Sequence, residues 1–127
     1  MADFFGDLTT VVLRKSLDAT GIRHRVIADN IANVETPGFT RSDVNFEAQL
    51  QNALASSDPE SAMRRVEDMA AEVEQDTISP AGVNGNNVNI DKEMAELTKN
   101  NLQYDALVQL LNLKGSMIRL AIKEGKA

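Results

Sequence analysis

The sequence predicts a mainly α fold: long N- and C-terminal helices paired as an antiparallel coiled coil, with an irregular, partly helical middle segment. Each end of the 127-residue chain places apolar residues at steps of three and four, the spacing of a helix that buries one side. The sequence between them is polar and rich in turn residues. Aromatic residues make up only 4% and Trp is absent, which favours a thin core of aliphatic side chains between helices.

The N-terminal helix is expected to cover about residues 4–33. Its apolar seam, with one polar interruption, consists of Phe5, Leu8, Val12, Lys15, Ala19, Ile22 and Val26. The helix should end before Pro37, because a residue that precedes proline is pushed out of the α region. Thr36, Pro37 and Gly38 then predict a turn, with Pro at the first central position and Gly supplying the positive φ of the second.

The middle segment, residues 36–88, is expected to be turn, loop and short helix. Residues 39–46 alternate in character but are too polar to predict a strand, and residues 46–55 form a short helix. A second helix should start at Asp58 as N-cap with Pro59 at its first position, and run to about Gln75. A mobile or partner-ordered segment remains open as an alternative, because acidic residues are in surplus there. Residues 79–89 read as loop.

The C-terminal helix is expected over about residues 90–123, with Asn89 as N-cap. Asn101 is expected to be a buried polar group that fixes the register of the two helices. The seam consists of Ile90, Met94, Leu97, Asn101, Tyr104, Val108, Leu111, Gly115, Ile118 and Ile122, and a second apolar flank of Leu102, Leu107, Leu110 and Leu113. We therefore expect residues 1–35 and 89–127 to form one coiled-coil domain, into which residues 36–88 are inserted.

Composition argues against several classes of function. The net charge of −6 is a poor match to nucleic acid or to an anionic membrane surface. There is no Cys, His24 is the only histidine, and no phosphate-binding loop or nucleophile elbow occurs. We expect no enzyme, cofactor, metal, nucleic acid or small-molecule substrate. The first residues lack the features of a cleavable secretory signal, and no stretch is long enough to span a bilayer.

Residues 28–41, ADNIANVETPGFTR, resemble the signature of the bacterial flagellar axial proteins, the rod, hook and hook-associated families. That signature has Asn-Ile/Leu-Ala-Asn, two variable residues, then Thr-Pro-Gly-Tyr/Phe and a basic residue. Residues 84–94 and 101–111 are similar to the flagellar basal-body rod family, closest to its proximal rod members. Phe39 replaces the frequent Tyr, and Val34-Glu35 differs from the proximal rod pattern. The motif turn consists of Asn30, Asn33, Thr36, Pro37, Gly38 and Phe39.

The resemblance implies a structural subunit of the proximal rod that polymerises through its terminal helices and transmits torque for motility. It implies a periplasmic place in the basal body, reached by type III export without a cleavable signal peptide. Implied partners are copies of itself, other rod proteins, a membrane-ring/rod adaptor protein and the flagellar export apparatus. Alternatives are another rod or hook component, or a small acidic helical export chaperone or adaptor. The subunit-packing residues predicted are Leu8, Val12, Ile22, Val26, Leu97, Tyr104, Val108, Leu111 and Ile118.

Overall fold

The chain folds into four helices and one short pair of strands, as a computed structural model that describes residues 4–125. In chain order the elements are α1 (Phe4–Ala32), β1 (Ser42–Val44), α2 (Phe46–Leu54), α3 (Pro59–Asp68), β2 (Val73–Gln75) and α4 (Ile90–Gly125). The mainly helical class, the long terminal helices and the irregular middle segment are confirmed. The first helix ends and the last begins within a residue of the predicted positions.

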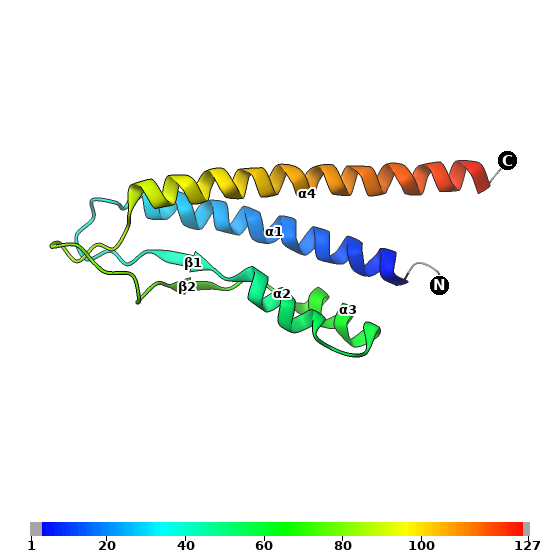
Figure 1. The fold of residues 1–127 in the computed structure, drawn as a ribbon, viewed down its shortest axis with the longest axis horizontal. Coiled ribbons are helices and arrows are strands. Elements are labelled where there is room, and N and C mark those ends of the chain that lie inside the picture. The colour runs from blue at the N-terminus through cyan, green and yellow to red at the C-terminus, as the bar shows by residue number, and fades with distance from the viewer. Residues whose placement is uncertain (1–3, 126–127) are drawn as a thin grey trace.

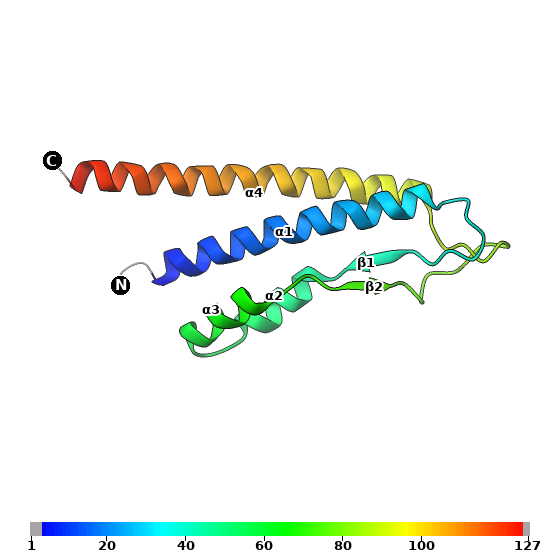
Figure 2. The same ribbon diagram turned by 180° about the vertical axis from the view of Figure 1, so that it is seen from behind.

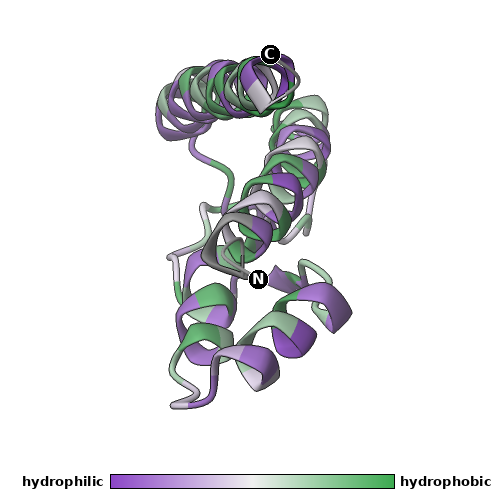
Figure 3. Cartoon of the chain, turned by 90° about the vertical axis from the view of Figure 1, so that its right-hand side faces the viewer, coloured by the Kyte–Doolittle hydropathy of each residue, from purple (hydrophilic) through white to green (hydrophobic). Residues whose placement is uncertain are grey.

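The elements lie in three layers, with α1 in the middle (Figures 1 and 3). Helix α4 runs antiparallel to α1 on one side, and α2, α3 and the two strands lie on the other. Helix α4 has 36 residues against 29 in α1, so at 1.5 Å per residue it is about 54 Å long. Its C-terminal end reaches beyond the start of α1 and stands away from the other elements (Figures 1 and 2).

The buried apolar core lies between α1 and the middle segment. One cluster joins Val11 to Ala53 and Val66, and a second joins Ala19 to Val44 and Phe46. Half-buried side chains complete them: Leu8, Val12, Leu50, Met63 and Met69 at the first, and Ile22, Val26, Leu50, Met69 and Ala71 at the second. Within the described residues, neither cluster includes a residue of α4. The seam of α1 therefore packs against α2, α3 and β1, each of which supplies only one or two buried apolar residues.

Two predictions about the middle segment are wrong. Residues 42–44 form strand β1, and the helix expected to reach Gln75 ends at Asp68 and is followed by β2. The strands pair antiparallel, with Asp43 opposite Glu74. The backbone turns extended at Met69 (φ −78°, ψ 142°), and the Met69 side chain packs against both clusters. In this extended conformation Met69 is half-buried against residues far away in the sequence, a contact that the local pattern does not encode.

The start of α3 agrees with the prediction, because the Asp58 side chain accepts a hydrogen bond from the Glu60 amide and Pro59 is the first helical residue. The start of α4 agrees as well, since Asn89 Oδ1 accepts from the Lys92 amide at 3.1 Å. Residues 79–89 carry no helix or strand. These features could be predicted from the sequence because each depends on residues that are close together in the chain.

Helix α4 turns a different side toward α1 than the seam predicts. Its buried residues are Glu93 and Asn100, whereas Asn101 is exposed, so the buried polar position is one residue earlier than expected. Leu97, Val108 and Leu111 of the predicted seam are half-buried, and Leu107 of the second flank joins them. The rotation lets Glu93 and Asn100 reach polar partners on the other elements, which leaves part of the apolar seam uncovered.

Candidate assembly interface

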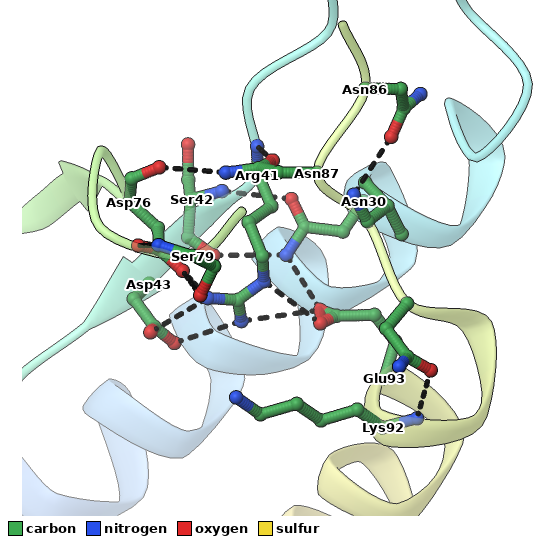
Figure 4. A network of polar contacts seen from close by, with 12 residues as sticks. Asn30, Arg41, Ser42, Asp43, Asp76, Ser79, Asn86, Asn87, Lys92 and Glu93 are labelled. Atoms are coloured by element: carbon green, nitrogen blue, oxygen red, sulfur yellow. Dashed lines mark hydrogen bonds and ion pairs between the residues drawn. The ribbon is translucent and has the colours of Figure 1, made fainter. Parts of the chain in front are cut away.

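A buried ion cluster fixes the end of the molecule where α1 finishes and α4 begins (Figure 4). Arg41 lies just before β1, and its guanidinium meets three carboxylates: Nε lies 3.0 Å from Glu93 Oε2, and Nη1 lies 2.8 Å from Asp76 and 3.0 Å from Asp43. Arg41 is buried and the Glu93 side chain is 0% exposed. One cation thus connects β1, the segment after β2 and the first turn of α4.

Asn30 ties α1 to the same cluster. Its amide nitrogen donates to Glu93 Oε1 at 2.7 Å and to the Ser42 carbonyl at 2.9 Å, and its Oδ1 accepts from the Ser42 amide at 2.9 Å. Its exposed fraction is 0%. We call Asn30, Arg41, Asp76 and Glu93 the clamp. Breaking such a buried pair by removing one partner costs about 3–5 kcal/mol, because the other charge is left uncompensated.

Hydrogen bonds favour the charged forms of Arg41 and Asp76. Burial by itself would lower the pKa of Arg41, but hydrogen bonds to Asp43, Glu93 and Asp76 outweigh it, and the pKa is raised. The pKa of Asp76 is lowered, first by the Ser79 hydroxyl and amide and then by Arg41. The Ser79 hydroxyl donates to Asp76 Oδ2 at 2.6 Å. Asp76 is therefore a carboxylate at neutral pH and can stay paired with Arg41.

The motif turn is bound to the loop before α4. Asn86 donates from Nδ2 to the carbonyls of Asn33 at 2.7 Å and Thr36 at 2.8 Å, which ties the loop to the turn where α1 ends. The Gly38 amide donates to the Asn84 carbonyl at 2.9 Å. Gly38 and Gly85 both have positive φ, at 75° and 80°. A Cβ on Gly85 would lie 3.4 Å from the Gly38 Cα, so turn and loop touch at two glycines.

The rest of the motif turn closes on itself. Asn33 donates to the Asp29 carbonyl at 2.8 Å and accepts from the Thr36 hydroxyl at 3.1 Å. The Phe39 amide donates to the Thr36 carbonyl at 3.2 Å, and Pro37 between them is exposed. The sequence singled out the turn but missed Asn86 and Glu93 as its partners, and Asp76 as the partner of Arg41. Glu93 could be noticed in the sequence as an acid in the first turn of α4, but the helix dipole explains an acid at that position equally well.

The contact between α1 and α4 becomes loose beyond Asn100. Asn100 donates from Nδ2 to the Thr20 carbonyl at 2.8 Å, but its buried Oδ1 has no partner among the described residues. A cavity of about 270 Å³ lies between α1, α2 and α4, lined in part by Ala19, Leu50 and Leu107. A second, of about 310 Å³, lies between α1 and α4 beside Gly21 and Tyr104. Polar contacts at one end, and not a tight apolar core, hold α4 to α1.

Helix α4 leaves a large apolar surface uncovered, which we call the outer face of α4. Met117 is 62% exposed and Leu113 57%. The outer face consists of Leu102, Leu110, Leu113, Met117 and Leu120 along one side, and of Tyr104, Ile118 and Ile122 along another. Lines of large, exposed apolar side chains along a helix are typical of surfaces that bind a partner.

The predicted subunit-packing residues fall into three groups. Tyr104 and Ile118 are exposed on the outer face. Leu97, Val108 and Leu111 are half-buried on α4. Those of α1 pack against the two apolar clusters: Leu8, Val12, Ile22 and Val26.

Two features of other functional classes are absent from residues 4–125. No helix there combines the length and the apolar content that crossing a bilayer demands. Nor do those residues bring three or more His, Cys, Asp or Glu side chains together in a way that could hold a metal ion.

Comparison with known proteins connects this geometry to a family. The sequence profile described as "Flagella basal body rod protein" matches residues 14–40, which include the motif turn. The chain is 32% identical over 119 residues to the flagellar basal body rod protein FlgB of Bacillus subtilis (strain 168), covering 90% of this chain and 92% of the relative. FlgB of Borreliella burgdorferi is 32% identical over 108 residues, with 74% and 80% covered. FlgB of Escherichia coli (strain K12) is 25% identical over 119 residues, with 82% and 86% covered. The chain belongs to the FlgB family of flagellar basal body rod proteins.

Proposed function

We propose that this chain is a structural subunit of the flagellar basal body rod, in its proximal part, and that it assembles through α1 and α4. The observation that supports this most is the outer face of α4, where six large apolar residues from position 110 onward are exposed: Leu110, Leu113, Met117, Ile118, Leu120 and Ile122. Burying a side chain of this kind contributes about 1.5–3 kcal/mol. A surface of this size on a helix suits permanent packing between subunits.

The clamp is consistent with a role of this subunit in transmitting torque. A load applied to α4 by a neighbouring subunit would reach α1 and the hairpin through Arg41, Glu93 and Asn30, at distances of 2.7–3.0 Å. Without those contacts, α4 would lose its buried polar link to the end of α1 and would keep the hydrogen bond from Asn100 to the Thr20 carbonyl. Residues 1–35 and 89–127 are, in this proposal, the polymerising unit, and residues 36–88 are an insertion that packs on α1.

The exposed members of the predicted packing set, Tyr104 and Ile118, are proposed to contact neighbouring subunits directly. Leu97, Val108 and Leu111 are proposed to lie at the edge of that contact. The α1 residues Leu8, Val12, Ile22 and Val26 are proposed to act by holding α1 rigid. The role is structural and needs no catalysis or cofactor.

The proposed partners are other copies of this chain and other rod proteins. We also propose contacts with the membrane-ring/rod adaptor protein and, before assembly, with the flagellar export apparatus. The proposed location is the periplasmic part of the basal body, reached without cleavage of a signal peptide. Family membership supports the place in the basal body, and the remaining points follow from the resemblance of the motif turn.

The test is replacement of the rod gene of a flagellated bacterium by this sequence, followed by purification of intact basal bodies. We expect the chain to be recovered from the rod by mass spectrometry at its full, uncleaved length, and swimming to be restored. An export chaperone or adaptor would restore flagella without being part of the purified structure. Absence of the chain from basal bodies that carry a rod would contradict the proposal.

A further inference from the structure

The charges of the chain are divided between its body and the tip of α4. Residues 1–109 contain nine Lys and Arg against eighteen Asp and Glu, a net charge of −9. Residues 110–127 contain four Lys and Arg against one Glu, a net charge of +3, and the two parts give the total of −6. We call residues 110–125, which the structure describes, the α4 tip. The tip is a basic and apolar projection from an acidic body, so two bodies repel each other and each attracts a tip.

A groove on the far side of the molecule has the complementary character. It lies between α2 and residues 68–72, has a volume of about 590 Å³, and we call it the α2–α3 groove. Its apolar lining comes from Ala53, Met69, Ala70 and Ala71, and its charged lining from Arg65, Asp68 and Glu72. Asp68 and Glu72 are exposed. Residues 58–76 around it contain seven acids and two arginines.

We propose that the α4 tip of one copy docks on the α2–α3 groove of a second copy. Leu113 and Met117, spaced by one helical turn, would enter the apolar part, and Lys114 and Lys123 would lie near Asp68 and Glu72. The proposal rests on the proposed function and adds to it the surface that receives α4. It accounts for both unpartnered features, the exposed apolar tip and the acidic groove, with one contact.

Geometry favours a second copy over the other ways to cover the tip. The tip cannot reach the groove of its own chain, because α1 lies between α4 and the layer of α2 and α3 (Figure 3). Pairing of two tips side by side would bring two net charges of +2 together, because residues 110–125 contain Lys114, Arg119 and Lys123 against Glu124. A tip-to-groove contact joins two different surfaces. A pair of copies therefore keeps one free tip and one free groove, so that further copies can add along a rod.

Cross-linking in assembled basal bodies tests the contact, and the chain contains no Cys that would interfere. A chain that carries both Met117→Cys and Ala70→Cys is expected to form a ladder of disulfide-linked oligomers on oxidation. The matched control carries Leu102→Cys with Ala70→Cys. Leu102 is exposed on the same side of α4 but lies outside the tip, so no ladder is expected.

The outcomes separate this contact from the proposed function. Basal bodies that contain the chain but give no ladder, or an equal ladder from the control, overturn the docking contact and leave the rod subunit intact. A disulfide between two Met117→Cys sites, or one to a different rod protein, overturns it too. Basal bodies without even the unmodified chain overturn the proposed function itself.

A charge exchange provides a second test if the cysteine variant does not assemble. Lys114→Glu with Lys123→Glu is expected to abolish swimming and to remove the chain from basal bodies, with circular dichroism unchanged. Adding Asp68→Lys and Glu72→Lys to the same chain places opposite charges across the contact again. We expect this fourfold variant to swim. If the fourfold variant is as defective as the twofold one, or if the twofold variant swims normally, the proposed contact is wrong.

Discussion

The side chains of Asn30 and Glu93 are joined by a buried hydrogen bond of 2.7 Å, although 63 positions separate them in the chain. Asn30 belongs to the last turns of α1 and Glu93 to the first turn of α4. The same carboxylate meets Arg41 through its other oxygen at 3.0 Å. This single acid therefore sets how α4 lies on α1, and it explains why α4 presents its outer face to solvent.

Replacing Glu93 should destabilise the subunit strongly. In Glu93→Ala, Arg41 loses a buried partner and Asn30 loses an acceptor, so we expect the free energy of unfolding to fall by about 3–5 kcal/mol. Urea denaturation followed by circular dichroism measures it. Asp91→Asn, in the same turn but exposed, should change the free energy by no more than about 0.5 kcal/mol. Equal effects of the two substitutions would show that the clamp is not needed.

Acid should destabilise the subunit in a defined window. The pKa of Asp76 is lowered below its ordinary value of 3.8 and that of Glu47, paired with Arg23, below 4.5. At pH values above those ordinary pKa values, both carboxyl groups are charged in the folded and in the unfolded chain. Their pairing then contributes fully to the stability of the fold. As the pH falls through and below those ordinary pKa values, only the unfolded chain takes up protons readily, so stability falls.

Denaturant midpoints measured from neutral pH down to about pH 3 test this dependence. Asp76→Asn should be less stable at neutral pH and should lose less on acidification. If the stability of Asp76→Asn depends on pH in the same way as that of the parental chain over the whole range, Asp76 is not a source of the acid sensitivity.

The two touching glycines give a third prediction. Gly85→Ala forces a side chain into φ 80°, which costs about 1–2 kcal/mol of folding free energy for an L-residue. Gly85→Asn should lose less, because Asn tolerates this region. Gly82→Ala is the control, since its Cβ would meet Asn84 and Asn86 at ordinary distances of 3.5 and 3.6 Å. Equal losses at both glycines, measured by thermal unfolding, would contradict the turn geometry.

Stability and assembly should respond to different apolar residues. Phe46→Ala empties the second cluster and should cost about 3–5 kcal/mol of unfolding free energy. Leu113→Ala removes an exposed side chain and should cost no more than about 0.5 kcal/mol in the isolated subunit. Leu113→Ala should nevertheless reduce swimming in complemented cells. A large loss of stability in Leu113→Ala would mean that the outer face of α4 is covered within the subunit.

Amide hydrogen exchange should differ between the two long helices of the isolated subunit. Residues 8–31 of α1 lie between two layers and pack on both clusters, so they should exchange slowly. Residues 110–125 of α4 have few buried contacts and should open locally and exchange faster. Exchange that is equally slow along both helices would contradict the loose contact beyond Asn100.

The parts of the fold that could be predicted from the sequence are those made by neighbours in the chain. The N-caps Asp58 and Asn89, the turn at Pro37 and Gly38, and the extent of α1, α2 and α4 all depend on contacts a few positions apart. The strand pair could not be predicted in this way, because residues 42–44 are polar and their partner lies about thirty positions on.

The orientation of α4 shows the same limit at the candidate site. A line of Leu, Ile and Met indicates which side of a helix is apolar, but not which part of that side meets another element of the same chain. Arg41 and Glu93 decide it from 52 positions apart, by a buried ion pair that favours one rotation of α4. The apolar residues left over by that choice are the ones available to neighbouring subunits.

The most direct test of the account compares the outer face of α4 before and after assembly. A single Cys at Leu113 is labelled with a maleimide in the isolated subunit and in purified basal bodies, with Ala81→Cys in the loop before α4 as control for access of the reagent. We predict that Leu113→Cys reacts as fast as Ala81→Cys in the isolated subunit and is protected in the rod. Labelling of Leu113→Cys that is equally fast in the rod, or already slow in the isolated subunit, would contradict the role of α4 as the assembly surface.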